Sequence, residues 1–446
     1  MSLTAEASPD FSALDAPRIN VSGRIVDVSP QAFRVAGLSP FVRLGDCIAC
    51  PGTAGDEIGE VVRIESDCLT VKPFGIRSTL GVKSTARRIG PYTVAPTTEW
   101  KGRVVNAFGE PVDGLGPIAK GSEERIADGS PPPALKRGRV GKPVQTGIRT
   151  IDIFTPLVKG QRIGIFAGSG VGKSTLMGML SRAKGFDTAV VALVGERGRE
   201  VREFLEETMA GHLDKVVTVV ATGDESPMMR RLAPKTATAV AEYYRDQGEN
   251  VLLIIDSVTR LAHAARDVAL AAGEPPVARG YPPSVFSELP QLLERAGPGF
   301  EGSGTITGVF SVLVDGDDHN DPIADAIRGT LDGHIVLDRA IAEQGRFPAV
   351  DVLKSISRLA DRAWNAQERE LVTRLRAMTA RFEDTRDLRL LGGYQRGSDT
   401  TLDQAVDLVP HIYDYLVQNP GDPVTDKPFK DLSKKLKEAF APPPAK

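Results

Sequence analysis

The chain has 446 residues, a length that favours two or three domains over one. Its hydrophobic content of 41% and charged content of 25% are those of average globular proteins, and a net charge of −3 excludes a general attraction to nucleic acid or anionic lipid. The sequence has no apolar run of the ~18 residues that span a membrane and no secretion signal, and three cysteines are too few for a disulfide scaffold, so we expect a cytoplasmic protein.

The N-terminal hundred residues indicate a tail followed by a β module. We expect residues 1–18 to form the tail and residues 19–94 to form a small β-barrel, because short β-type runs there are broken by Gly, Pro and Asp at regular intervals. Cys47 and Cys50 form a C-x-x-C without a second pair. We interpret them as small buried hydrophobic residues of a strand and not as a metal or redox site.

The middle of the chain has the pattern of an α/β domain, which we place at residues 95–359. After a Gly- and Pro-rich segment, β-branched runs alternate with helical stretches, and these runs lack the polar alternation of half-exposed strands. The runs are RIGIFA, AVVALVG, KVVTVVA, NVLLIID, TGVFSVLV and HIVLD. Residues 360–446 are rich in helix formers, which predicts a helical C-terminal domain ending in a disordered tail.

A phosphate-binding loop follows the first of these runs. The strand RIGIFA precedes a glycine-rich loop and then a helical stretch, so backbone N–H groups and the helix N-terminus would surround a polyphosphate. Lys173 would reach the β- and γ-phosphates of ATP, and the hydroxyl of Ser174 would bind Mg²⁺. The first position of the usual motif, a glycine, is Ala167 here. The predicted loop residues are Ala167, Gly168, Ser169, Gly170, Val171, Gly172, Lys173, Ser174 and Thr175.

Two further strand ends supply acidic residues for the same site. Asp256 ends NVLLIID, and its carboxylate would be the second Mg²⁺ ligand at the carboxyl edge of the sheet. Glu196 follows AVVALVG and is our candidate for activating water, with Arg197 beside it to neutralise charge in the transition state. The residue pattern alone leaves open that Glu196 and Arg197 merely begin a charged helix. Together with the loop, these residues predict a Mg²⁺-dependent P-loop ATPase.

With these segments in place, the chain resembles the catalytic subunits of the rotary ATP synthase superfamily, and within it the ATPases of flagellar and type III protein export. The resemblance extends from about Ile19 to Phe440. It is carried by TGIRTID, AGSGVGKS, GERGREV, LLIIDSVTRLA, ARGYPPSVFSELPQLLERAG and DGHIVLDRAIAEQGRFPAVDVLKSISR.

The resemblance implies a RecA-like core with a mostly parallel sheet, an N-terminal β-barrel, a helical C-terminal domain and a homohexameric ring. It also implies that Arg358, in SISR, is an arginine finger that acts on the nucleotide of a neighbouring subunit. The implied partners are a stator-like regulator dimer, a coiled-coil stalk protein, membrane proteins of the export gate, and export substrates with their chaperones. A protein with these partners would be attached peripherally to the inner-membrane export apparatus.

Some points stay open at this stage. The pre-barrel segment offers only Phe11 and Leu14 as apolar anchors for a regulator. Tyr394 is a candidate for stacking on adenine, although a packed or surface tyrosine fits its context equally well. The favoured function is flagellar export, with virulence-type secretion as the alternative. A rotary-synthase or structural subunit is a weaker alternative, because Glu196 and an intact Gly-Lys-Ser loop argue against a non-catalytic subunit. An RNA translocase is also weaker, because the barrel segment has few aromatic residues and no basic cluster.

Overall fold

The computed structural model describes residues 21–53, 55–208, 213–314 and 321–439. The expected N-terminal tail with Phe11 and Leu14, and the last residues of the chain, lie outside these ranges. The chain divides into two compact units, residues 1–91 and 92–446. Within the described ranges, no helix is both long and apolar enough to span a membrane.

The first unit contains the expected closed barrel, with strand order β1-β2-β5-β4-β3-β6 and antiparallel neighbours throughout. Alternate side chains along the strands fill its interior, because successive residues of a strand point to opposite faces. Ile25, Phe33 and Val71 are among these core residues. The strands are β1 (Ser22–Val28), β2 (Phe33–Ala36), β3 (Asp46–Gly52), β4 (Gly55–Ile64), β5 (Cys68–Pro73) and β6 (Thr85–Pro91).

The C-x-x-C segment lies in this barrel. Cys47 and Cys50 are buried on β3, as the apolar pattern predicts, and both are free thiols. Burial raises the pKa of each thiol to about 12. The thiolate that redox or metal chemistry requires is therefore disfavoured at both positions.

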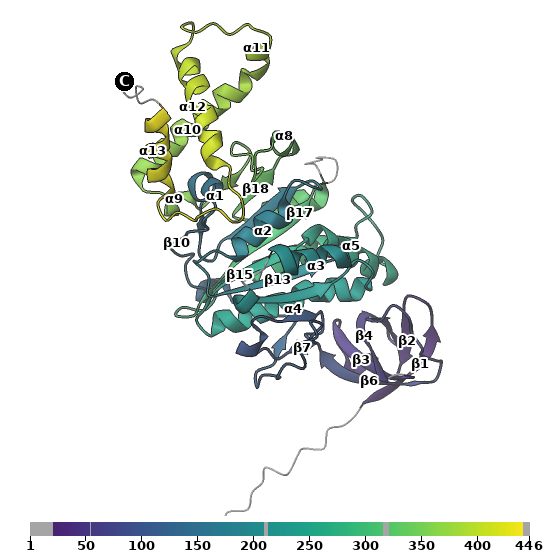
Figure 1. The fold of residues 1–446 in the computed structure, drawn as a ribbon. Helices are drawn as coiled ribbons and strands as arrows, with labels where there is room; N and C mark the ends of the chain where they lie inside the picture. Colours follow the sequence, from purple (N-terminus) through teal and green to yellow (C-terminus); the bar gives the residue numbers. More distant parts are fainter. Residues whose placement is uncertain (1–20, 54, 209–212, 315–320, 440–446) are drawn as a thin grey trace, which may run out of the picture. The chain divides into compact units, whose positions relative to one another are not determined.

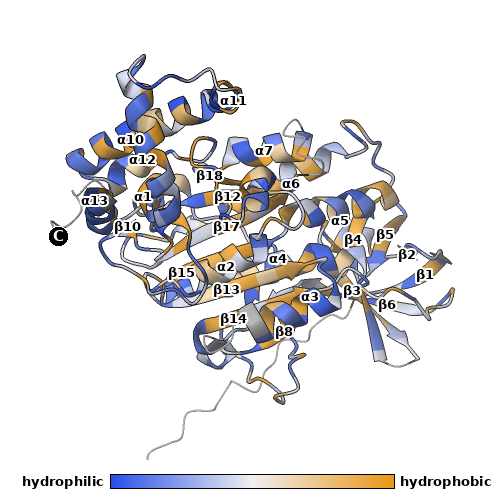
Figure 2. Ribbon diagram, turned by 45° about the horizontal axis from the view of Figure 1, so that its top comes forward, coloured by the Kyte–Doolittle hydropathy of each residue, from blue (hydrophilic) through white to orange (hydrophobic). Residues whose placement is uncertain are grey.

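The second unit is built on a nine-stranded sheet with the order β19-β18-β12-β17-β15-β13-β14-β8, to which β16 adds beside β17. The strands from β18 to β8 are parallel, as expected for a RecA-like core, and only β16 and β19 pair in antiparallel. Figure 2 shows that central strands such as β13 consist largely of hydrophobic residues, and every residue of β13 is buried. The strands are β8 (Val104–Asn106), β12 (Arg162–Ala167), β13 (Thr188–Val194), β14 (Val216–Ala221), β15 (Asn250–Asp256), β16 (Gly297–Pro298), β17 (Thr305–Leu313), β18 (Gly333–Leu337) and β19 (Ile356–Ser357).

Two small sheets complete the β-structure of this unit, namely β7 (Thr93–Val94) with β9 (Arg125–Ile126) and β10 (Pro143–Val144) with β11 (Leu157–Val158). Thr93 and Val94, which we expected at the end of the barrel, therefore pair with a strand of the second unit.

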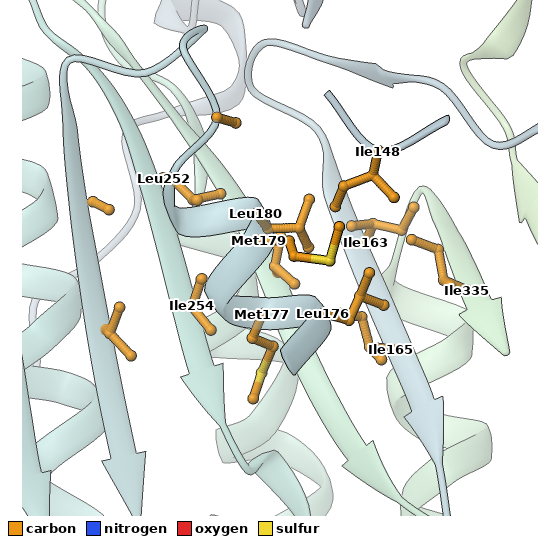
Figure 3. Packing of buried hydrophobic residues seen from close by; sticks show 14 of the residues in the cluster. Ile148, Ile163, Ile165, Leu176, Met177, Met179, Leu180, Leu252, Ile254 and Ile335 are labelled. Atoms are coloured by element: carbon orange, nitrogen blue, oxygen red, sulfur yellow. The ribbon is translucent and has the colours of Figure 1, made fainter. Parts of the chain in front are cut away.

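Helices cover the parallel sheet, and α2 lies across its strands on one face (Figures 1 and 3). Leu176 and Leu180 of α2 pack against Ile165 of β12 and Ile254 of β15 in one buried cluster. This packing fixes the start of α2 relative to the ends of both strands. The helices associated with the sheet are α1 (Arg149–Phe154), α2 (Lys173–Ser181), α3 (Gly198–Glu203), α4 (Pro227–Asp246), α5 (Val258–Ala271), α6 (Pro283–Glu294), α7 (Pro322–Thr330) and α8 (Arg339–Glu343).

The chain after the sheet is helical, as predicted. Val372 of α10 and Val409 of α12 belong to a separate hydrophobic cluster that also includes Phe154 of α1 and Leu432 of α13. This cluster joins the helical region to the sheet-containing part of the same unit. The helices are α9 (Ala360–Ala363), α10 (Ala366–Asp384), α11 (Arg386–Leu390), α12 (Thr400–Leu416) and α13 (Pro428–Ala439).

Candidate nucleotide site

The glycine-rich loop connects the carboxyl end of β12 to the first residue of α2. Gly170 and Gly172 have φ values of 79° and 90°, in the left-handed region that glycine adopts most readily. Ala167 is still the last residue of β12 and pairs with β17 and β18 in regular register. Alanine is tolerated at this position because the turn itself begins after it.

Lys173 meets both predicted carboxylates at the carboxyl edge of the sheet. Its Nζ lies 2.5 Å from Asp256 Oδ1 and 3.7 Å from Glu196 Oε1. Ser311 on β17 also donates a hydrogen bond to Asp256 Oδ1, at 2.5 Å. Side chains from β15, from β17, from the segment after β13 and from the first residue of α2 therefore converge, as expected when parallel strands end at one edge.

Glu196 is held in an unusual electrostatic environment. Burial, followed by the negative charge of Asp256, raises the pKa of Glu196 to about 7. Within the described part of the chain, its Oε1 atom is buried without a hydrogen-bond partner. A carboxyl group with a pKa near neutrality, whose Oε1 meets Lys173 only as an ion pair at 3.7 Å, is suited to exchanging a proton with water.

Arg260 is a site residue that the sequence reasoning missed. It lies in the first turn of α5 and pairs with Glu196 Oε2 at 3.1 Å, and its guanidinium also donates to the carbonyl of Gly195. Gly195 has φ = 69°, and an added Cβ would lie 2.9 Å from the Arg260 side chain, so the close approach requires glycine. In the sequence, Arg260 could have been found from its position four residues after Asp256, the last residue of β15.

Phe347 was also missed. An added Cβ on Gly172 would lie 3.5 Å from Cδ1 of Phe347, so the ring borders the phosphate loop, and 41% of the residue is exposed. Tyr394 instead lies between α11 and α12, where its hydroxyl donates to Asp403 Oδ1 at 2.6 Å. Phe347 therefore lies beside the phosphate loop, whereas Tyr394 is hydrogen-bonded within the helical region.

The two predicted arginines are not part of the Lys173 cluster. The Arg197 side chain is 72% exposed and pairs with Glu200 at 3.7 Å. Arg358 is exposed directly after β19, where its backbone N–H donates to the carbonyl of Asp332 at 2.9 Å. Asp332 precedes β18 and bonds to Arg162 at the amino end of β12. Arg358 is therefore at the edge of the sheet opposite to the phosphate loop.

Comparison with known proteins identifies the family and the fold. Residues 147–357 match the model of the ATP synthase alpha/beta family, nucleotide-binding domain, and residues 364–438 match the T3SS EscN ATPase C-terminal domain. The flagellum-specific ATP synthase of Rhizobium meliloti strain 1021 is 56% identical over 97% of this chain and 91% of that protein.

The chain belongs to the ATP synthase alpha/beta family.

Two further proteins are similar to this chain over most of its length. The SPI-2 type 3 secretion system ATPase of Salmonella typhimurium is 44% identical over 90% of this chain and 91% of that protein. The solved structure of the assembled ATPase EscN from enteropathogenic E. coli superposes with a TM-score of 0.86, at 38% identity, covering 94% of this chain and all of that one. The resemblance and the fold class inferred from the sequence are confirmed, and as a family member the protein is a P-loop ATPase.

Proposed function

We propose that this ATPase energises type III protein export and that its system is the flagellar one. The convergence of Lys173, Glu196 and Asp256 at the mouth of the phosphate loop supports catalysis. Such an arrangement exceeds what nucleotide binding alone requires, because it includes a candidate base. The flagellar assignment rests on relatives named flagellum-specific ATP synthase at 56% and 48% identity. Others of that name, at 45% and 42%, are about as similar to this chain as the virulence-type secretion ATPases at 43% and 44%.

The residues at the loop fit ATP with Mg²⁺. The exposed hydroxyl of Ser174 and the carboxylate of Asp256 are hard oxygen donors, the kind that Mg²⁺ prefers. The glycines at positions 170 and 172 keep side chains away from the inner face of the loop. When bound, Mg²⁺ supplies neutralisation of phosphate charge, and Ser174 and Asp256 would hold it.

The remaining roles follow from position and charge. Lys173 would move from Asp256 towards the terminal phosphates and stabilise their negative charge. Glu196 would orient water and accept its proton, and Arg260 would hold Glu196 in place through the ion pair already present. Phe347 would stack on the base, since its ring lies beside the loop and is partly exposed.

Arg358 would act on a neighbouring subunit and not on its own nucleotide. The six residues of β12 separate the two edges of the sheet by roughly 20 Å, at about 3.3 Å per residue. This separation exceeds the reach of one arginine side chain. An arginine finger supplied by a neighbouring subunit accelerates hydrolysis by roughly 10³- to 10⁵-fold. We therefore propose that the active form is a ring, composed of six copies of this chain.

An exposed apolar segment supports the proposed stalk partner. Leu390 and Leu391, between α10 and α12, are 76% and 86% exposed. One solved relative is the assembled EscN in complex with its central stalk EscO, with a TM-score of 0.82 to this chain. We propose that these leucines contact a stalk protein. The regulator dimer, the export gate, substrates with chaperones, and peripheral attachment to the inner membrane remain proposals from the resemblance.

The RNA translocase alternative has less support. Phe33 and Phe74 of the barrel segment are buried and cannot stack on bases, and although Phe41 is 54% exposed, the segment has no basic cluster to hold a phosphate backbone beside it. A structural role without catalysis predicts that turnover survives in Glu196→Gln.

The export function is tested by replacing the chromosomal gene with one encoding Lys173→Ala in the source bacterium. We expect loss of filament and hook proteins from the culture medium while their cellular levels stay normal. A variant with an exposed change, Glu203→Gln, is the matched control and should export normally. Normal flagella together with loss of needle-type secretion would instead assign the protein to the virulence system.

A further inference from the structure

Gln161 is fully buried at the amino end of β12, the strand whose other end carries the phosphate loop. Its side chain makes three hydrogen bonds. Oε1 accepts from the backbone N–H of Val158 at 3.1 Å, and Nε2 donates to the carbonyl of Asp332 at 3.3 Å and to the hydroxyl of Ser357 at 3.0 Å. A neutral amide is suited to this position because it offers an acceptor and two donors without charge.

Both groups to which Gln161 donates also define the position of Arg358. Ser357 immediately precedes Arg358, and the carbonyl of Asp332 accepts the backbone N–H of Arg358 at 2.9 Å. Gly333 pairs with Ser357, and an added Cβ on Gly333 would lie only 2.4 Å from the carbonyl oxygen of Ile356. The short strand β19 therefore lies tightly against β18, with the Gln161 side chain beneath it.

We propose that Gln161 is a positioning residue for the arginine finger: it fixes the backbone from which Arg358 extends towards the neighbouring subunit. This inference rests on the proposed function of Arg358. Gln161 has no place in the nucleotide site of its own chain, because β12 separates it from the phosphate loop. Its loss should affect the site of the neighbour and leave ATP binding to its own chain intact.

The first variant is Gln161→Met, which has similar volume and no amide. We expect full-length rings of this variant to lose about tenfold or more in kcat, since a misplacement near 1 Å can cost ~10²-fold. The KM and the equilibrium affinity for ATP should change less than twofold. The matched control is Thr307→Val, which removes another fully buried hydrogen bond, that from Gly160 N–H, without touching β19. It should leave kcat unchanged even if it lowers the melting temperature.

Mixed rings give the decisive readout. Lys173→Ala subunits have no active site of their own but an intact Arg358. In a large excess of these subunits, each Gln161→Met subunit should turn over ATP as fast as a wild-type subunit diluted in the same way. Failure of this rescue, or loss of ATP affinity in Gln161→Met, would show that Gln161 acts on its own phosphate loop and would overturn the proposal.

Two further samples keep the test interpretable. Arg358→Ala mixed with Lys173→Ala tests the finger itself. Absence of rescue there contradicts the proposed function of Arg358 and the inference with it, whereas rescue of Arg358→Ala without rescue of Gln161→Met overturns the inference alone. If Gln161→Met fails to fold, Ser357→Ala removes the same hydrogen bond from the other side and should show the same rescue.

Discussion

Lys173 and Asp256 lie 2.5 Å apart, Nζ to Oδ1, although 83 residues separate them in the sequence. Both side chains are shielded from solvent, with exposed fractions of 11% and 3%. Removing one member of a buried ion pair leaves an unpaired charge in a site of low dielectric constant, whereas removing both does not. This pair therefore has consequences for stability as well as for catalysis.

Lys173→Met should abolish ATP turnover and destabilise the protein without nucleotide by about 3 kcal/mol, the lower part of the range for breaking a buried pair. The double variant Lys173→Met, Asp256→Asn should recover most of this stability and none of the turnover. Urea unfolding of both variants and of wild type measures the difference. A double variant as unstable as the single one would show that the pair is not the source of the loss.

Glu196→Gln should retain ATP binding, and its turnover rate should fall about 10²- to 10⁴-fold, the usual contribution of a positioned base. The amide has the same shape but cannot accept a proton from water. ATP affinity measured by calorimetry and phosphate release measured under saturating ATP separate the two effects. Glu203→Gln, on the exposed surface of the following helix, is the control. Turnover that survives in Glu196→Gln would remove Glu196 from the mechanism and favour another base.

Phe347→Ala should weaken ATP binding by about tenfold or more, because stacking of a base on an aromatic ring contributes ~1–3 kcal/mol. Binding of inorganic tripolyphosphate should be unchanged, since it has no base. Tyr394→Ala provides the direct comparison between the two candidate aromatic residues. If Tyr394→Ala selectively loses ATP affinity and Phe347→Ala does not, the sequence-based candidate is the correct one.

Glu288 on α6 should make stability depend on pH in the acidic range. Burial by itself would raise the pKa of Glu288, but the positive charges of Arg231 and Lys235 outweigh it and hold the pKa at about 2. The folded pKa is below the ordinary value of 4.5, so this contribution is present above pH ~4.5 and is lost as pH falls towards 2. The shift corresponds to about 3 kcal/mol at neutral pH.

The variant Glu288→Gln should therefore melt at a lower temperature than wild type at pH 7 and pH 5, with a difference that shrinks steadily below pH 4.5. Glu206→Gln, which removes a solvent-exposed pair with Arg202, should change stability by less than ~0.5 kcal/mol at any pH. A difference for Glu288→Gln that stays constant down to pH 3 would contradict the assigned pKa.

Much of the fold could be predicted because its strands are buried on both faces. The runs RIGIFA and NVLLIID correspond to β12 and β15 residue for residue. Glu196 and Asp256 could be assigned to one edge since parallel strands share a direction. Their convergence on Lys173 was predictable for the same reason.

Other features depend on tertiary contacts that no local pattern encodes. Arg260 follows an expected strand, but only the fold shows that its side chain turns back to Gly195 and Glu196. Phe347 reaches the phosphate loop through a segment about 175 residues away in sequence, which spacing arguments cannot detect. Arg197, adjacent to Glu196, points to solvent because it begins a helix at the end of the turn. The position of Gln161 beside β19 likewise depends on contacts with residues that are distant in sequence, Asp332 and Ser357.

The closed barrel of the first unit has a consequence for how subunits could associate. Each of its six strands pairs on both sides, so the barrel offers no open strand edge that a second chain could extend by backbone hydrogen bonding. Contacts that it makes between copies therefore do not extend its sheet, and exposed side chains such as Phe41 and Leu44 are available for them. Copies in contact through this barrel can therefore separate while all of its strand pairs stay intact.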